Sequence, residues 1–199
     1  MSGSRGIFYD NTMSGDRLVR EYLQTNPANW VQTFESPFHT YRYTSAGASN
    51  CCTLMSAILP SNLEVNAIMK GANVNPMMGI ALRKSRNAVF IDAGMIYLWL
   101  TGGTLGLAIV TTAGATPVLA TAAYVVDITK WHHLRIQVIG RLVNAKVWVH
   151  GTAEPAWMIS YRVGYKEMKM NGTVALLGTT ETVYYTDFRA TPIPRTGGP

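Results

Sequence analysis

Acidic side chains are the first residues whose spacing could indicate catalysis, because glycoside hydrolysis uses two carboxylates about 5–10 Å apart. On a single strand, that separation requires acids two or four positions apart. The chain has 11 acidic residues, and no two of them are closer than five positions: Asp10, Asp16, Glu21, Glu35, Glu64, Asp92, Asp127, Glu154, Glu167, Glu181 and Asp187. The sequence therefore contains no local catalytic dyad, although acids from distant strands could still meet.

Metal ligation and nucleophilic catalysis have equally little support in the residue pattern. His132 and His133 are adjacent, so on a strand they point to opposite faces, while His39 and His150 stand alone. The nucleophile motif Gly-x-Ser-x-Gly and the glycine-rich phosphate loops are absent from the sequence. We therefore expect a protein that is not an enzyme and that uses no cofactor and no metal.

Residues 131–150 predict a β-hairpin centred on Gly140-Arg141. Glycine at the first central position fits a two-residue type II′ turn. In such a hairpin, two residues lie opposite each other when their numbers sum to 281. One face is then apolar and pairs Leu134 with Val147, Ile136 with Ala145 and Val138 with Val143. The other face pairs His133 with Trp148, Arg135 with Lys146 and Gln137 with Asn144.

The polar side of this hairpin is the candidate contact surface. Like charges directly opposite each other are unfavourable, so Arg135 and Lys146 require a nearby acid or an anionic partner. We predict that His133, Arg135, Lys146 and Trp148 contact either a neighbouring protein or a glycan. In the alternative interpretation, a covering strand or loop buries Trp148, since large aromatic residues are mostly buried on average.

The elements that must position this surface are short strands, because apolar residues alternate with period two along most of the chain. The predicted strands are 38–43, 53–59, 63–70, 79–84, 88–92, 95–100, 105–111, 118–126, 132–139, 142–150, 157–163, 173–177 and 182–189. Such strands, separated by Gly, Pro, Asn and Ser, are typical of an antiparallel sandwich or barrel. A helical stripe of Leu18, Val19, Tyr22 and Leu23 predicts one short N-terminal helix over 14–23. We expect a single domain over 1–191 and a Pro/Gly-rich tail over 192–199.

Composition excludes disordered, collagen-like and disulfide-rich classes, since 48% of the residues are hydrophobic and only 14% are charged. The net charge is +6, but the 17 basic residues are scattered. Only residues 83–86, Arg-Lys-Ser-Arg, form a local cluster, and a solvated loop explains it. We therefore expect no nucleic-acid partner.

An uncharged stretch of 34 residues, 93–126, is long enough to suggest a membrane span. Its many glycines and threonines and its Pro117 suit short strands instead. We expect these strands to be buried in the core or against neighbouring subunits, with no membrane contact. The opening residues Met1-Ser-Gly-Ser-Arg-Gly lead into no apolar stretch, so we expect no signal peptide and synthesis in the cytoplasm.

The order of several segments carries a family resemblance. Those segments are Phe8-Tyr-Asp-Asn, Trp30, Trp131-His-His-Leu-Arg-Ile-Gln-Val, Ala145-Lys-Val-Trp-Val, Asn171-Gly-Thr-Val-Ala-Leu-Leu-Gly and Val183-Tyr-Tyr-Thr-Asp-Phe-Arg-Ala. The arrangement resembles the concanavalin A-like lectin/glucanase superfamily and its laminin G-like modules. That resemblance implies a two-sheet jelly roll whose first and last strands lie side by side. If they pair, Asp10 and Asp187 could offer oxygens to Ca²⁺, although roles as turn and edge residues are the interpretation we prefer.

Two classes of function compete for such a chain. Cytoplasmic synthesis and a nearly charge-free central third favour a structural protein of a tailed-phage virion. As a capsid decoration or tail-associated protein, it would bind other virion proteins and form a homo-oligomer through apolar interfaces. The alternative is a carbohydrate-binding, lectin-like module. Resemblance of fold alone does not establish sugar binding, so both functions remain open at this stage.

Overall fold

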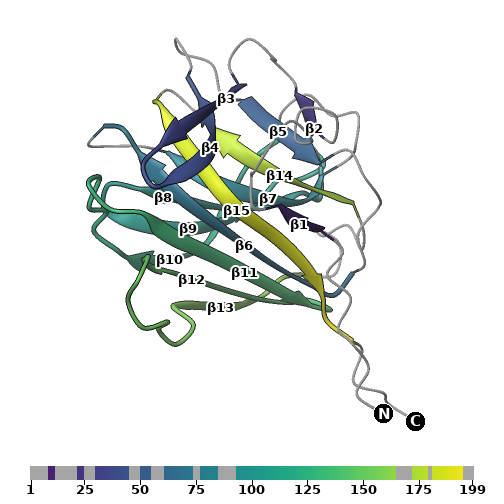
Figure 1. The fold of residues 1–199 in the computed structure, drawn as a ribbon. Helices are drawn as coiled ribbons and strands as arrows, with labels where there is room; N and C mark the ends of the chain where they lie inside the picture. Colours follow the sequence, from purple (N-terminus) through teal and green to yellow (C-terminus); the bar gives the residue numbers. More distant parts are fainter. Residues whose placement is uncertain are drawn as a thin grey trace, which may run out of the picture.

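The computed structural model describes residues 9–11, 22–24, 30–44, 50–54, 61–73, 77–84, 93–164, 172–178 and 181–194. These residues form two antiparallel β-sheets that pack face to face (Figure 1). We call the sheet nearer the viewer in Figure 1 the front sheet and the other the back sheet. The architecture confirms the predicted two-sheet sandwich of jelly-roll type.

The front sheet contains the hairpin that carries the candidate contact residues. It runs in the order β13 (Ile159–Arg162), β12 (Leu142–Val149), β11 (His132–Ile139), β6 (Leu63–Gly71), β15 (Val183–Pro192), β4 (Phe38–Tyr43) and β3 (Trp30–Glu35). Strand β1 (Tyr9–Asn11) pairs with the second half of β15. The first and last strands of the described chain therefore lie side by side, as the resemblance implied.

The back sheet contains most of the uncharged stretch. Its order is β10 (Val118–Ala123), β9 (Thr104–Ile109), β8 (Ile96–Thr101), β7 (Met78–Lys84), β14 (Thr173–Gly178), β5 (Asn50–Leu54) and β2 (Tyr22–Gln24). Strands β8 and β9 bury alternate apolar side chains in the core, as predicted for this segment. The loop after β9 is exposed, and Val118 and Val125 are 57% and 83% exposed. Among the described residues, no helix is long and apolar enough to cross a membrane.

Alternating side chains from the two sheets meet in one core. The hairpin contributes its predicted apolar face, Leu134, Ile136, Val138, Val143, Ala145 and Val147. Tyr185 of β15 crosses from the front to the back sheet, where its hydroxyl accepts a hydrogen bond from the Gly79 N–H (2.7 Å) and donates to the Leu177 carbonyl. Burial raises the pKa of Tyr185 far above its usual value. The two sheets are therefore joined by polar contacts as well as by apolar packing.

The hairpin register is confirmed in full. Strands β11 and β12 pair from His132 with Val149 to Ile139 with Leu142, and each pair of numbers sums to 281. Gly140 has a φ of 58°, while Arg141 is not among the residues with a positive φ. This combination is that of the predicted type II′ turn.

We expect Gly140→Ala to destabilise the protein by about 1–2 kcal/mol, because a side chain at positive φ strains the backbone. A Cβ at this position would meet no atom within 4 Å, so packing does not contribute to the loss. Gly103 is a matched control, since its Cβ position is equally open and its φ is not in the left-handed range. Urea unfolding measures both variants. Equal losses of unfolding free energy in the two variants would show that the positive φ of Gly140 does not cause the destabilisation.

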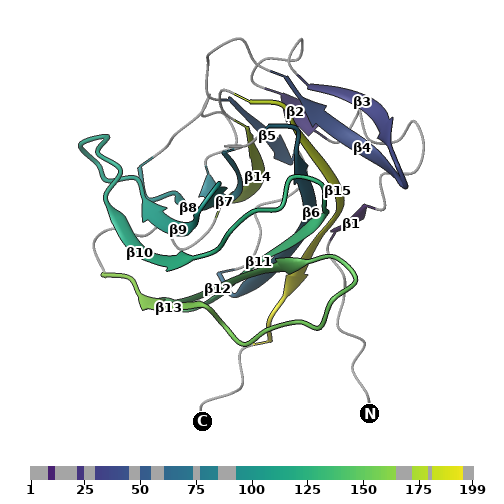
Figure 2. The same ribbon diagram turned by 90° about the vertical axis from the view of Figure 1, so that its left-hand side faces the viewer.

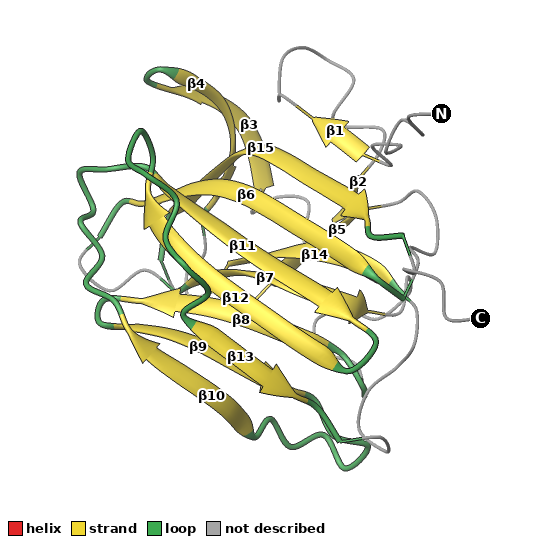
Figure 3. Ribbon diagram, turned by 90° about the horizontal axis from the view of Figure 1, so that it is seen from below, coloured by secondary structure: helices red, strands yellow, loops and turns green. Residues whose placement is uncertain are grey.

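The N-terminal third differs most from the sequence-based expectations. Strands β1, β2 and β3 were not predicted, and Tyr22 and Leu23, which end the predicted helix, belong to strand β2. Figure 3 shows no helix in the described part of the chain. The rest of the predicted helix and the predicted strand over 88–92 lie outside the described residues. Short strands of this kind are held by long-range pairing, which local periodicity does not report.

The C-terminal boundary is also slightly different. Strand β15 continues to Pro192, and the N–H of Ile193 donates to the Asn62 carbonyl at 3.1 Å. The first two residues of the predicted tail are therefore attached to the sandwich. The division into a domain and a tail stays a prediction.

The basic cluster does not lie on a solvated loop, and that prediction was wrong for its first two residues. Arg83 and Lys84 end strand β7 and are 5% and 0% exposed. The Arg83 guanidinium donates to the carbonyls of Ser61 (2.7 Å) and Gly140 (3.2 Å). Burial lowers the pKa of Arg83 to about 10. Arg83 is thus a structural link between two loops, and neither residue offers its charge to a nucleic acid.

Candidate functional site

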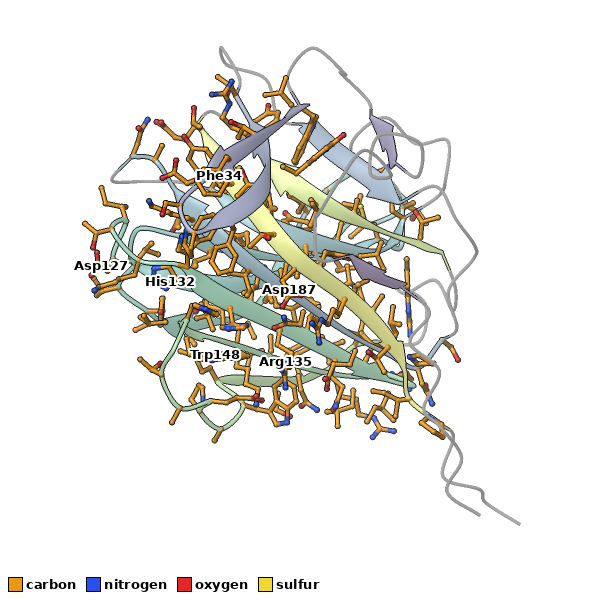
Figure 4. The ribbon with its side chains drawn as sticks, viewed as in Figure 1. Phe34, Asp127, His132, Arg135, Trp148 and Asp187 are labelled. Carbon is orange, nitrogen blue, oxygen red and sulfur yellow. The ribbon has the colours of Figure 1, made fainter. Side chains whose placement is uncertain are left out.

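The outer side of the front sheet carries a continuous layer of polar side chains. Strand β6 lies beside β11 in the register Gln137 with Glu64, Arg135 with Asn66 and His133 with Ile68. We call this surface the polar face; it comprises Glu64 and Asn66 of β6, His133, Arg135 and Gln137 of β11, Asn144, Lys146 and Trp148 of β12, and Glu154 of the loop after β12. Figure 4 shows Arg135 and Trp148 close together on this side of the sheet.

The two opposed cations have the acid that the sequence required. The Glu154 Oε1 atom lies 2.7 Å from Arg135 Nη1 and 2.5 Å from Lys146 Nζ. Glu64 Oε1 lies 3.8 Å from the same Arg135 nitrogen and also accepts, through Oε2, a hydrogen bond from Gln137. Burial alone would raise the pKa of Glu154, but the Lys146 hydrogen bond and the nearby positive charges outweigh it and lower that pKa. Glu154 is therefore ionised and contacts both cations, although its single charge offsets only one of the two.

Trp148 supports the polar face instead of projecting from it. Its ring is stacked on His133 with a centroid distance of 4.5 Å and an interplanar angle of 5°. The Arg135 guanidinium lies 5.2 Å from the ring centroid, and Trp148 is only 7% exposed. The structure thus matches the interpretation in which Trp148 is covered. His133 and Arg135 therefore cover most of the Trp148 ring and leave little of its surface for a partner.

His133 belongs to a chain of hydrogen-bonding and stacking contacts. Its Nε2 atom lies 2.9 Å from Nδ1 of His150, and its Nδ1 atom lies 3.3 Å from Oδ1 of Asn66. The Phe38 ring packs edge-on against His150 with a centroid distance of 5.4 Å. Burial, His150 and Arg135 together lower the pKa of His133 to about 4. His133 is therefore neutral near pH 7 and acts as a hydrogen-bonding and stacking group.

Because the pKa of His133 is about 6.5 in an unfolded chain and about 4 here, the unfolded state binds more protons between these values. We therefore expect stability to fall by up to about 1 kcal/mol between pH 7.5 and pH 5.5, above the range where carboxylates titrate. His133→Gln should reduce this dependence in chemical unfolding, and the remainder comes in part from His132, whose pKa burial also lowers. An unchanged difference between the two pH values in the variant would contradict the assignment.

Two projecting segments border the polar face. Figure 2 shows the β3–β4 hairpin and the loop between β12 and β13 extending beyond the front sheet on its outer side. The first is anchored by the Lys70–Glu35 ion pair (2.8 Å) and by the Ser36 carbonyl, which accepts from Trp131 Nε1. The second is anchored by Lys146, whose Nζ donates to the Pro155 carbonyl at 3.0 Å.

Asp187 lies on the same side of the front sheet, at an irregularity in strand β15 (Figure 4). The register between β15 and β6 shifts between Thr186 and Arg189, and Asp187 has a positive φ of 45°. Its Oδ1 accepts from Arg189 Nε at 3.1 Å. Strand β1 places Asp10 opposite Arg189, but the Asp10 side chain lies outside the described part. Among the described residues, no group of three or more ligating side chains gathers for a metal.

Sequence reasoning identified the hairpin residues but missed their long-range neighbours. His133, Arg135 and Lys146 do come together on one face, as predicted. Asn66, Glu64 and Glu154 were not predicted as site residues. The sequence did indicate that an acid such as Glu154 must lie nearby, because Arg135 and Lys146 are opposed cations. Whether this surface contacts a partner stays a prediction.

Comparison with known proteins shows the fold and no family. No family model and no curated protein matches the chain. Among solved structures, the carbohydrate-binding module CBM66 from Bacillus subtilis is 14% identical, with a TM-score of 0.68, covering 86% of this chain and 95% of its own. The exoplasmic/lumenal domain of VIP36, in a form bound to Ca²⁺ and Man2, is 11% identical, with a TM-score of 0.64, covering 95% and 88%.

A hydrolase is also among the similar structures. The xylan beta-1,4-xylosidase from Bacillus halodurans C-125 is 13% identical, with a TM-score of 0.64, and the match covers 92% of this chain but only 38% of the xylosidase. The comparisons thus include binding modules and an enzyme, and the absence of catalysis stays a prediction. None of these proteins supports the virion role that was favoured from the sequence. At these identities the similarity shows the fold alone.

Proposed function

We propose that this chain is a non-catalytic carbohydrate-binding module that holds a glycan on the polar face. The observation that carries the proposal is a contiguous set of donors and acceptors, Arg135, Glu64, Asn66 and His133, which lies over the Trp148 ring. Sugar hydroxyls both donate and accept, so they suit a surface that alternates charged donors with carboxylates. A fold shared with carbohydrate-binding proteins makes this the favoured ligand class.

The polar face is accessible and already ordered. The side chains of Arg135, Glu64 and Glu154 are 25%, 29% and 38% exposed, so a ligand can reach each of them. The Trp148 ring and the Glu64 contact hold Arg135 in position before binding. Less side-chain entropy is therefore lost when a glycan binds than on a surface of freely rotating groups.

The carboxylates of the polar face suit binding better than hydrolysis. Glu64 and Glu154 both approach Nη1 of Arg135, so the fold brings together two acids that are far apart in sequence. A glycosidase needs one of its two acids protonated, with a raised pKa. The pKa of Glu154 is instead lowered, and the Arg135 charge lies between the two carboxyl groups. We therefore propose that neither acts as a general acid.

A glycan array followed by calorimetry tests the proposal. We expect saturable binding to one class of oligosaccharide, with a dissociation constant in the micromolar to millimolar range, and no release of sugar on long incubation. Turnover of the bound oligosaccharide would contradict the non-catalytic assignment. A symmetric oligomer that binds no glycan would contradict the whole proposal and favour the virion role.

A further inference from the structure

The position of the Glu154 carboxylate can serve as a binding site for an external acid. A single oxygen of Glu154 contacts two cations that face each other across the β11–β12 hairpin. We propose that this position is a subsite for the carboxylate of a uronic-acid-containing glycan, which replaces Glu154 on binding. The proposal deepens the proposed function and rests on it. It makes Glu154 an internal competitor of the ligand.

The two cations need an anion at this position because of where the sheet places them. Arg135 and Lys146 are directly opposite in the register, and the Lys146 side chain is only 8% exposed. A cation with so little solvent is unfavourable unless it is paired. Glu64 cannot substitute for Glu154, because it is 3.8 Å from Arg135 and is also bonded to Gln137. The subsite therefore selects for a negative group.

Glu154 is the replaceable member of this cluster. It belongs to a loop in which residues 150–154 are all exposed, and its own side chain is 38% exposed. Lys146 Nζ keeps a second anchor on the Pro155 carbonyl and lies 4.2 Å from the centroid of the Trp157 ring. The loop can therefore stay attached through Lys146 while the Glu154 side chain rotates out.

The groups around the subsite suit a sugar acid. The Arg135 side chain is 25% exposed, and its Nη1 atom already holds the Glu154 carboxylate at 2.7 Å, so the same nitrogen can hold an external carboxylate. A guanidinium forms strong charge-assisted hydrogen bonds with a carboxylate. The half-buried Trp157 ring lies beside the Lys146 ammonium, where it can pack against the sugar that carries the acid.

Matched glycans separate the charge from the sugar skeleton. Oligogalacturonate, hyaluronan and alginate oligosaccharides are each compared with their carboxyl-reduced forms by calorimetry, with α-poly-L-glutamate as an acidic chain without sugar. We expect at least one uronate to bind at least tenfold more tightly than its reduced form. Poly-L-glutamate should bind at least tenfold more weakly than that uronate.

The direction of the affinity change in Glu154→Gln tests whether Glu154 competes with the ligand. Removing the internal competitor should tighten uronate binding about twofold to fivefold, the range expected for the loss of a partly exposed ion pair. The control is Glu181→Gln, which removes the same charge beside Asn73, beyond the opposite end of β6 from Glu64, and should leave the affinity unchanged. Thermal melting of both variants verifies that the sandwich remains folded.

Four other results would contradict the inference, and each has a different meaning. Equal affinity for acidic and reduced glycans would contradict the subsite while leaving carbohydrate binding intact. Weaker binding of Glu154→Gln to both forms would show that Glu154 contacts the sugar directly. Equal binding of poly-L-glutamate would assign the surface to an acidic peptide. A protein that binds none of the glycans would overturn both the inference and the proposed function.

Discussion

Replacing Tyr185 by Phe is expected to lower the free energy of unfolding by roughly 1–3 kcal/mol, the usual cost of a buried polar group left without its partner. The Tyr185 hydroxyl is the group through which β15 contacts the backbone of β7 and β14. Its loss leaves the Gly79 N–H and the Leu177 carbonyl without this bond in the core. Urea unfolding, monitored by tryptophan fluorescence, measures the change.

Tyr184→Phe is the matched control for this prediction. Tyr184 is the adjacent residue on the same strand, it points to the other face and it is only half-buried. We expect its effect to stay within about 0.5 kcal/mol, as for most surface substitutions. Equal losses in the two variants would contradict a special role for the hydroxyl between the sheets.

The second large effect concerns binding. Arg135→Gln should weaken glycan affinity at least about tenfold, because charge-assisted hydrogen bonds are among the strongest single contacts in recognition. Arg135 is the hub of the polar face: it contacts Glu154 and Glu64 and lies over Trp148. Calorimetry with the oligosaccharide that binds wild type most tightly gives the measurement.

Arg162→Gln controls for net charge. Arg162 is exposed on strand β13 and pairs with Leu142 at the far end of the front sheet. The substitution removes the same charge and should change affinity less than about twofold, since exposed charges are largely screened at physiological salt. If both variants lost affinity equally, binding would depend on overall charge and not on the polar face.

The part of the fold that sequence alone could predict is the part set by local rules. The β11–β12 hairpin follows from a glycine at the first turn position and from alternation on both strands, and its register is confirmed residue by residue. The pairing of β6 with β11 and β15 is not local. It joins residues separated by more than sixty positions, and alternation does not identify the partner of a strand.

The candidate site divides in the same way. The cross-strand pairs of His133 with Trp148 and Arg135 with Lys146 follow from the turn. Asn66 comes from β6 and could not be assigned without the sheet order. The basic run at residues 83–86 shows the opposite error. Its local pattern is typical of a solvated loop, but Arg83 and Lys84 are buried, and the Arg83 guanidinium donates hydrogen bonds to backbone carbonyls of distant loops.

The central claim is that the polar face binds a glycan. The most direct test is an amide chemical-shift titration of the full chain with the tightest-binding oligosaccharide from the array. We expect the largest shifts in β11, in β12 and in residues 150–158, with little change in β8, β9 and β10 of the back sheet. Shifts confined to the back sheet, or none with any oligosaccharide, would contradict the account.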